Sequence, residues 1–207
     1  QIGFLDLDLN TDNRGLIFDI FIELGKSKKI NEINSQSIST LKRSNKLINN
    51  SFKKDRLISK KFIQILKSEQ NLSSILRTMK NVGVLQSYIP DFAEIVGQMQ
   101  FDLFHIFTVD EHTFKVVRNM RQMKINYSDE FRLENELIKK IPKIEILYIA
   151  GLFHDLGKGK GGNHSEIGAK ISRDFAKRLG LSLADSDLIS WLVLHHLKMS
   201  SISQRQD

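Results

Sequence analysis

Cysteine is absent from this 207-residue chain, which excludes disulfide bonds and any zinc site built on thiolates. That absence also suits the cytoplasm. Long apolar runs are lacking too, because the longest, residues 146–153, is far too short to cross a bilayer. The first residues show no signal-peptide pattern. We therefore expect a cytoplasmic globular protein that makes no use of a membrane, with 41% hydrophobic residues to build its core.

The net charge of +7 comes from one segment. Between Lys26 and Lys67, twelve Lys or Arg residues stand against two acids, an excess of ten, so the rest of the chain sums to −3. Stretches rich in Lys, Asn and Ser are typical of solvated helix faces, and a docking surface for an acidic partner or a neighbouring domain is the alternative. No aromatic residues interleave with these cations in a stacking pattern, which disfavours nucleic acid as a partner.

Helical spacing dominates the first part of the chain. The dense apolar run at residues 15–24 predicts a buried helix, and apolar residues recur at helical intervals over 38–52, 60–66 and 72–84. Residues 2–9 end in alternating apolar and acidic positions, which predicts one short strand.

Helix signals are clearer in the second part. Thr108 and Glu111 form a capping box, and Asn163 with Glu166 can cap a later helix. Helices are expected over about 108–123, 144–154, 163–179 and 185–197, and the second of these is apolar enough to lie at the centre of the fold. The sequence therefore predicts an all-α fold with two parts, a helical linker region over 1–95 and a second domain over 96–207.

Histidines gather in a pattern that scattered surface residues would not show. Five of the six stand next to each other, next to Asp155, or near the ends of predicted helices: His112, His154, His164, His195 and His196. Neutral imidazoles and carboxylates are ligands of first-row divalent metals. Burying His154 beside Asp155 at a helix end is costly without a partner, and a metal ion would satisfy both. An isolated His–Asp hydrogen bond is the alternative. His105 is interpreted as a packing or surface residue.

The number of candidate ligands indicates two ions. Together with Asp155 and Asp207, the five histidines exceed what one tetrahedral site needs, which favours two adjacent metals bridged by Asp155. Paired metals suit phosphoester hydrolysis, because they activate water and steady the charge on the phosphoryl oxygens. Each of His164, His195 and His196, taken separately, fits a structural or surface role equally well.

Lys158 is the second candidate catalytic residue beside Asp155. It follows the His154-Asp155 pair by one turn, between glycines that let the backbone approach an anion, so we interpret it as a phosphate contact. A solvated loop lysine is the alternative. The glycine-rich loop lacks the spacing of a P-loop, and no predicted strand precedes it.

Three long blocks resemble a known family. IVGQMQFDLFHIFTVDEHTFKVVRNM, LFHDLGKGKGGNHSEIGA and LHHLKMSSISQRQD are similar to the HD domain of bacterial bifunctional uridylyltransferase/uridylyl-removing enzymes, which belongs to the HD superfamily of metal-dependent phosphohydrolases. Residues 13–91 resemble, more loosely, the helical linker before that domain. By this resemblance four residues match the core metal ligands, namely His112, His154, Asp155 and Asp207. His164, His195 and His196 match the additional histidines of two-metal members.

The resemblance implies a particular reaction. It is hydrolysis of the phosphodiester between UMP and a tyrosine of the PII nitrogen-regulatory protein, with Mn²⁺ or Mg²⁺ and promotion by glutamine; iron and zinc also fit the ligand types. It further implies a nucleotidyltransferase domain and glutamine-sensing ACT domains elsewhere in the same protein, and this sequence shows no nucleotidyltransferase motif. The chain does not begin with Met and stops directly after Asp207, so we expect an excised piece of a longer protein.

Two other functions remain open at this point. One is a different HD enzyme acting on a free nucleotide, such as a guanosine-tetraphosphate hydrolase. The other is a non-catalytic module that serves docking or regulation. Cleavage of free nucleotides would identify the first, and an inability to bind metal would identify the second.

Overall fold

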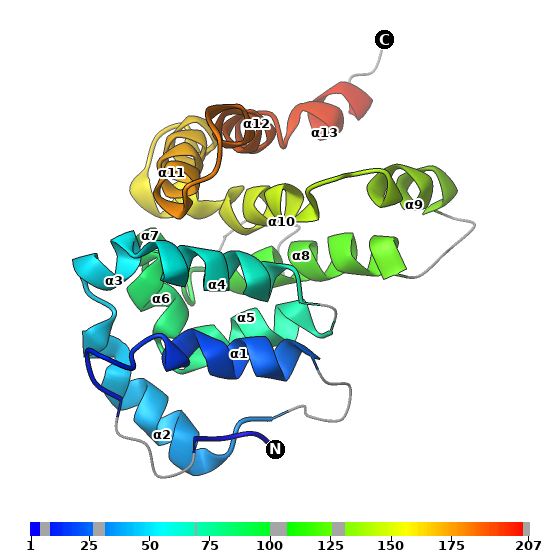
Figure 1. Cartoon of the computed structure of the whole chain (residues 1–207). Coiled ribbons are helices and arrows are strands. Elements are labelled where there is room, and N and C mark those ends of the chain that lie inside the picture. Colours follow the sequence, from blue (N-terminus) through cyan, green and yellow to red (C-terminus); the bar gives the residue numbers. More distant parts are fainter. Residues whose placement is uncertain (5–8, 27–31, 69, 100–106, 126–130, 205–207) are drawn as a thin grey trace. The chain divides into compact units, whose positions relative to one another are not determined.

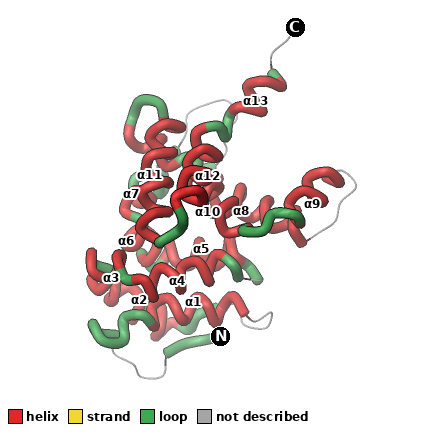
Figure 2. The backbone as a smooth tube through the Cα atoms, turned by 45° about the horizontal axis from the view of Figure 1, so that its top comes forward, coloured by secondary structure: helices red, strands yellow, loops and turns green. Residues whose placement is uncertain are grey.

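A computed structural model describes residues 1–4, 9–26, 32–68, 70–99, 107–125 and 131–204. In this described part, all regular structure is helical and the rest is loop and turn (Figure 2). It contains no strand, only isolated bridges between Ile2 and Ile33 and between Met99 and Thr108. The all-α prediction is confirmed. The strand expected over residues 2–9 is not formed at its described positions, and residues 5–8 lie outside them. None of the described helices is long and apolar enough to cross a membrane.

The chain divides into two compact units, residues 1–93 and 94–207, which are described separately here. The helices of the first unit are short (Figure 1), and they are α1 (Leu16–Lys26), α2 (Ser35–Ser44), α3 (Asn50–Lys54), α4 (Arg56–Leu66), α5 (Leu72–Asn81), α6 (Val84–Tyr88) and α7 (Pro90–Ala93), with a 3₁₀ turn η1 (Asn45–Leu47) after α2.

Aromatic side chains form the core of the first unit. Phe18 on α1 packs edge-to-face against Phe52 and Tyr88, with ring centroids 5.4 Å and 4.9 Å away, and Phe62 on α4 lies 6.0 Å from the same ring. All four side chains are fully buried. Because large aromatic rings bury much apolar surface and prefer tilted or edge-to-face pairs, this cluster holds α1, α3, α4 and α6 together.

The prediction of one helical segment over residues 38–52 is wrong. The structure ends α2 at Ser44, inserts η1, and starts α3 at Asn50. Asn45 donates a side-chain hydrogen bond to the carbonyl of Val82, and the Asn49 side chain accepts from the backbone N–H of Phe52. Asparagine side chains compete with the helical backbone in this way. Asn45 therefore connects the end of α2 to Val82, and Asn49 caps α3, so neither residue lies inside an α-helix.

The second unit contains six α-helices among its described residues. They are α8 (Val109–Ile125), α9 (Arg132–Lys139), α10 (Ile144–Phe153), α11 (His164–Leu179), α12 (Leu183–Leu194) and α13 (Lys198–Ser203), and a 3₁₀ turn η3 (Leu156–Lys160) joins α10 to α11. The helix α10 packs against α8, α11 and α12 (Figure 1). Nearly all of its residues are buried, as the apolar sequence predicts.

Capping residues set both ends of α11 and the start of α12. The Asn163 side chain accepts from the backbone N–H of Ser165 and begins α11, and Gly180 ends it with a positive φ of 82°. Ser182 caps α12, which starts two residues before the expected Asp185. That helix ends at Leu194 instead of continuing to 197, so His195 and His196 lie in the turn that follows.

Candidate metal centre

Asp155 lies at the centre of the histidine cluster. It directly precedes η3, and only 2% of its side chain is exposed. Its Oδ2 atom lies 3.2 Å from His154 Nε2 and 3.8 Å from His112 Nε2. Its Oδ1 atom lies 3.9 Å from His164 Nε2 and 3.8 Å from His196 Nε2. One buried carboxylate thus faces four imidazoles from four different segments.

The two oxygens of Asp155 divide the cluster into two groups. We call Oδ2 with His112 and His154 the Oδ2 group, and Oδ1 with His164 and His196 the Oδ1 group. In each of the two groups, the three possible ligand atoms lie within 4.8 Å of one another. Such spacing is compact enough for one divalent cation per triad, with the carboxylate shared between them.

Backbone carbonyls orient two of the imidazoles. His154 Nδ1 lies 2.8 Å from the carbonyl oxygen of Gly151, and His196 Nδ1 lies 2.7 Å from that of Val193. A carbonyl only accepts, so Nδ1 donates in both rings, and the Nε2 atom of each ring faces Asp155. This is the arrangement by which proteins fix the tautomer of a metal-binding histidine.

Charge keeps Asp155 ionised. Burial raises the pKa of its carboxyl, but hydrogen bonding and charge from His154, and then from Lys158, outweigh burial and hold the pKa below its usual range. Lys158 Nζ lies 2.9 Å from Asp155 Oδ2. Asp155 therefore stays negatively charged at neutral pH.

The Oδ1 group fits a cation on chemical grounds. Burial lowers the pKa of both His164 and His196, so their rings are neutral at pH 7. Within the described part of the chain, Asp155 Oδ1 and the Nε2 atoms of both histidines are buried without a hydrogen-bond partner. Buried lone pairs that face one another are costly, and a divalent cation among them would satisfy all three.

A close backbone approach positions the loop that follows Asp155. A Cβ added at Gly157 would lie 2.1 Å from the carbonyl oxygen of His164, so only glycine lets η3 pass the start of α11. The segment before α8 also contacts η3, because Gln98 Nε2 donates to the carbonyl of Lys158 at 3.4 Å and Lys160 pairs with Glu94 at 2.7 Å. The sequence analysis expected the glycines beside Lys158 to let the backbone approach an anion, and it overlooked the close approach of Gly157 to His164.

Most of the candidate residues are brought together, and some are not. The structure gathers His112, His154, Asp155, Lys158, His164 and His196. It does not bring His195 to either group; its ring lies 5.0 Å from that of Trp191 instead. Neighbouring residues at a helix end point in different directions, so the His-His pair places one imidazole beside Asp155 rather than two. Asp207 and His105 lie outside the described residues.

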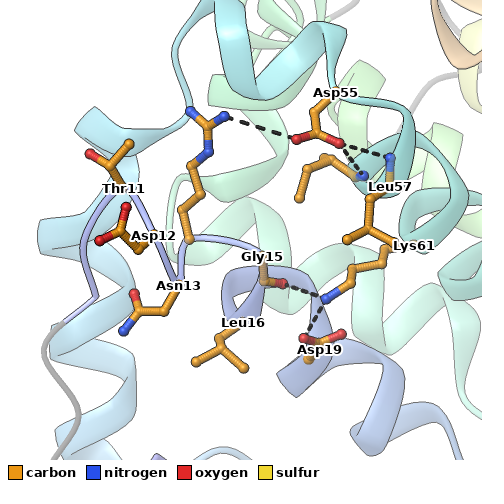
Figure 3. Close-up of a pocket in the computed structure, with 11 residues that line it drawn as sticks. Thr11, Asp12, Asn13, Gly15, Leu16, Asp19, Asp55, Leu57 and Lys61 are labelled. Carbon is orange, nitrogen blue, oxygen red and sulfur yellow. Dashed lines mark hydrogen bonds and ion pairs between the residues drawn. The ribbon is translucent and has the colours of Figure 1, made fainter.

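A pocket in the first unit contains none of the candidate residues. It is a cavity of about 410 Å³ between the start of α1 and the start of α4. Figure 3 shows Lys61 there, donating to the Asp19 carboxylate and to the carbonyl of Gly15, while Asp55 caps α4 at Leu57. These charged groups are used in holding the two helices together.

Family comparison agrees with the helical fold and the cluster. Residues 109–206 match the HD domain model, and residues 1–88 match the model of the uridylyltransferase GlnD third domain. The part of the chain with the histidine cluster therefore matches the HD domain, and the part before it matches the GlnD third domain.

Among curated proteins, the chain is similar to enzymes named bifunctional uridylyltransferase/uridylyl-removing enzyme. The one from Ectopseudomonas mendocina is 43% identical over 192 residues, covering 92% of this chain and 21% of that enzyme. Those from Azotobacter vinelandii and Nitrosococcus oceani are 42% and 40% identical over the same length. The chain spans about a fifth of the length of these relatives.

Proposed function

We propose that this chain forms the uridylyl-removing hydrolase region of a bifunctional uridylyltransferase, and that it releases UMP from the uridylylated PII nitrogen-regulatory protein. Residues 96–207 would be the hydrolase domain and 1–95 the helical linker region. The observation that supports this most is the buried Asp155 carboxylate, which faces four imidazoles and one lysine. The names of the similar enzymes suggest which reaction such a cluster performs.

The proposed metal ligands are Asp155 and the histidines that surround it, His112, His154, His164 and His196, with Asp207 as a further ligand from the sequence pattern. When bound, Mn²⁺ or Mg²⁺ supplies Lewis acidity, activating water and neutralising charge on phosphoryl oxygens. Asp155 joins the two groups through its two oxygens. The carbonyls of Gly151 and Val193 hold the rings of His154 and His196 with Nε2 toward the centre.

Charge holds the phosphoryl group of the substrate, and the tyrosine is an easily expelled leaving group. Lys158 Nζ, 2.9 Å from Asp155, contributes a positive charge beside the position of the phosphoryl group. The leaving group is the tyrosine side chain, whose pKa is about 10 in the free state, so the chain needs no strong general acid to expel it.

The test is an assay of UMP release from uridylylated PII with and without added Mn²⁺. We expect release that depends on metal and is lost in Asp155→Ala, whereas free nucleotides are left intact. Cleavage of guanosine tetraphosphate in preference to uridylylated PII would contradict the proposed substrate. Wild-type rates in Asp155→Ala would contradict the proposed site.

A further inference from the structure

The two ligand groups around Asp155 are not equivalent, although among the described residues each offers one carboxylate oxygen and two imidazoles. The Oδ2 atom already has a cation beside it, because Lys158 Nζ lies at 2.9 Å. The Oδ1 atom has no hydrogen-bond partner among the described residues, and neither has the Nε2 atom of His164 or His196. The same carboxylate is therefore satisfied on one side and unsatisfied on the other.

The position of Lys158 follows from the backbone. It lies three residues after Asp155, and its N–H donates to the Asp155 carbonyl at 3.0 Å, where the 3₁₀ turn η3 begins. Side chains three residues apart eclipse each other in a 3₁₀ helix, so the ammonium group is placed directly over the carboxylate. The lysine side chain is mostly buried, with 17% exposed, so its charge is only weakly screened by solvent.

A divalent cation meets different conditions at the two groups. At the Oδ1 group it would complete three buried atoms and displace no protein charge. At the Oδ2 group it would meet the ammonium of Lys158 at short range, where like charges repel strongly in a partly buried site. That repulsion falls only when the lysine side chain turns away from Asp155.

We propose that the two groups bind metal in a fixed order, the Oδ1 group first, and that Lys158 weakens binding at the Oδ2 group until it moves away from Asp155. In this scheme Lys158 is a positioning residue: it balances the charge of Asp155 before the second ion arrives and is released by that ion. The scheme rests on the metal site of the proposed function, but it concerns the binding of ions and not the hydrolysis.

The chain offers a matched control for Lys158. Lys160 belongs to the same turn and has the same charge, yet its ammonium pairs with Glu94 at 2.7 Å and not with Asp155. Lys158→Met removes the charge at the centre, Lys158→Arg keeps a charge there, and Lys160→Met removes a charge from the same turn away from the centre.

The experiment is a calorimetric titration of metal-stripped protein with Mn²⁺, with the bound ions counted by electron paramagnetic resonance. We expect two binding events in the wild type. Lys158→Met should strengthen the weaker event by about tenfold or more, because it removes a like charge at short range, and leave the tighter one nearly unchanged. Lys158→Arg and Lys160→Met should behave as the wild type. His164→Ala should abolish the tighter event, and His112→Ala should retain it.

Several results would overturn the proposed order. One is an unchanged affinity of the weaker event in Lys158→Met, and another is an equal gain in that affinity in Lys160→Met. A third is loss of the tighter event in His112→Ala but not in His164→Ala. Absence of any Mn²⁺ binding would overturn both the order and the metal site of the proposed function. Ordered binding without UMP release would leave the order standing and contradict the hydrolase alone.

Discussion

Two polar regions of this molecule use similar side chains to different ends. In the pocket of the first unit, Lys61 pairs with Asp19, and Asp55 caps α4 and lies 4.0 Å from Arg14. In the second unit, the Oδ1 atom of Asp155 and the Nε2 atoms of His164 and His196 are buried without a hydrogen-bond partner among the described residues. Groups that satisfy each other hold helices together, whereas buried groups left unsatisfied indicate a ligand that the protein is built to receive.

The largest effect should come from Asp155→Asn. The amide keeps the shape of the side chain but removes the charge shared by both groups, so we expect the protein to fold and to lose metal binding. With Mn²⁺ at about 1,000 times its Kd, the wild type should gain about 4 kcal/mol of stability, and the variant almost none. Thermal unfolding with and without Mn²⁺ measures this. A full metal-dependent gain in the variant would contradict the assignment of Asp155.

Gly157→Ala should be the next most severe. The added Cβ would lie 2.1 Å from the backbone carbonyl of His164, which cannot move without shifting the start of α11. We expect a loss of about 3 kcal/mol in unfolding free energy together with weaker metal binding. Denaturant unfolding checks the stability. Gly97→Ala is the control for a glycine in open space, although its φ of 71° costs some backbone strain.

The adjacent pair His195 and His196 tests the geometry directly. His196→Ala removes a proposed ligand and should lower Mn²⁺ affinity by about 100-fold or more, beyond the usual cost of losing an outer partner of a metal site. His195→Ala should change it little, because that ring lies against Trp191. Calorimetry on both variants decides between them. Equal losses would mean that both histidines of the pair bind the ion.

Metal affinity should fall as the pH is lowered. Burial lowers the pKa of His164 and His196 below the usual value of about 6.5, so both are neutral ligands above that pH. Protons compete with metal only as the pH falls below 6.5 and through the lowered pKa values. We therefore expect constant affinity from about pH 7 to 8 and a decline below pH 6.5, measured by titration at each pH. A decline that begins above pH 7 would contradict the burial argument.

Lys61→Met should have the smallest effect. It breaks the pair with Asp19, whose side chain is 35% exposed, and partly exposed ion pairs contribute about 1 kcal/mol or less. We expect a small loss of stability and unchanged Mn²⁺ binding, measured by denaturant unfolding and calorimetry. A loss of metal affinity in this variant would contradict the view that the pocket of the first unit only holds helices together.

Much of the fold could be predicted from periodicity and caps. The apolar residues 144–153 predict a buried helix because the run is longer than most buried strands, and Gly180 ends α11 as expected. The prediction failed where asparagine side chains reach distant or local backbone, as at Asn45 and Asn49. The periodicity of apolar residues continues through such positions, so the sequence pattern alone does not reveal the break.

The candidate site was also predicted only in part. The histidines beside apolar helix ends could be listed from the sequence, and four of the five lie around Asp155. Sequence pattern could not separate His195 from His196, because both residues occupy the same kind of position. Only the direction of each side chain, after α12 ends at Leu194, distinguishes them.

Local periodicity and the chemistry of single side chains were enough to predict the helical class, the family that each part resembles and the residue types able to bind a divalent metal. The folded arrangement was needed to see which imidazoles face which oxygen of Asp155, and that the Lys158 ammonium lies 2.9 Å from Oδ2. Those relations depend on distances between segments up to 84 residues apart in the chain, from His112 to His196, and on side-chain direction.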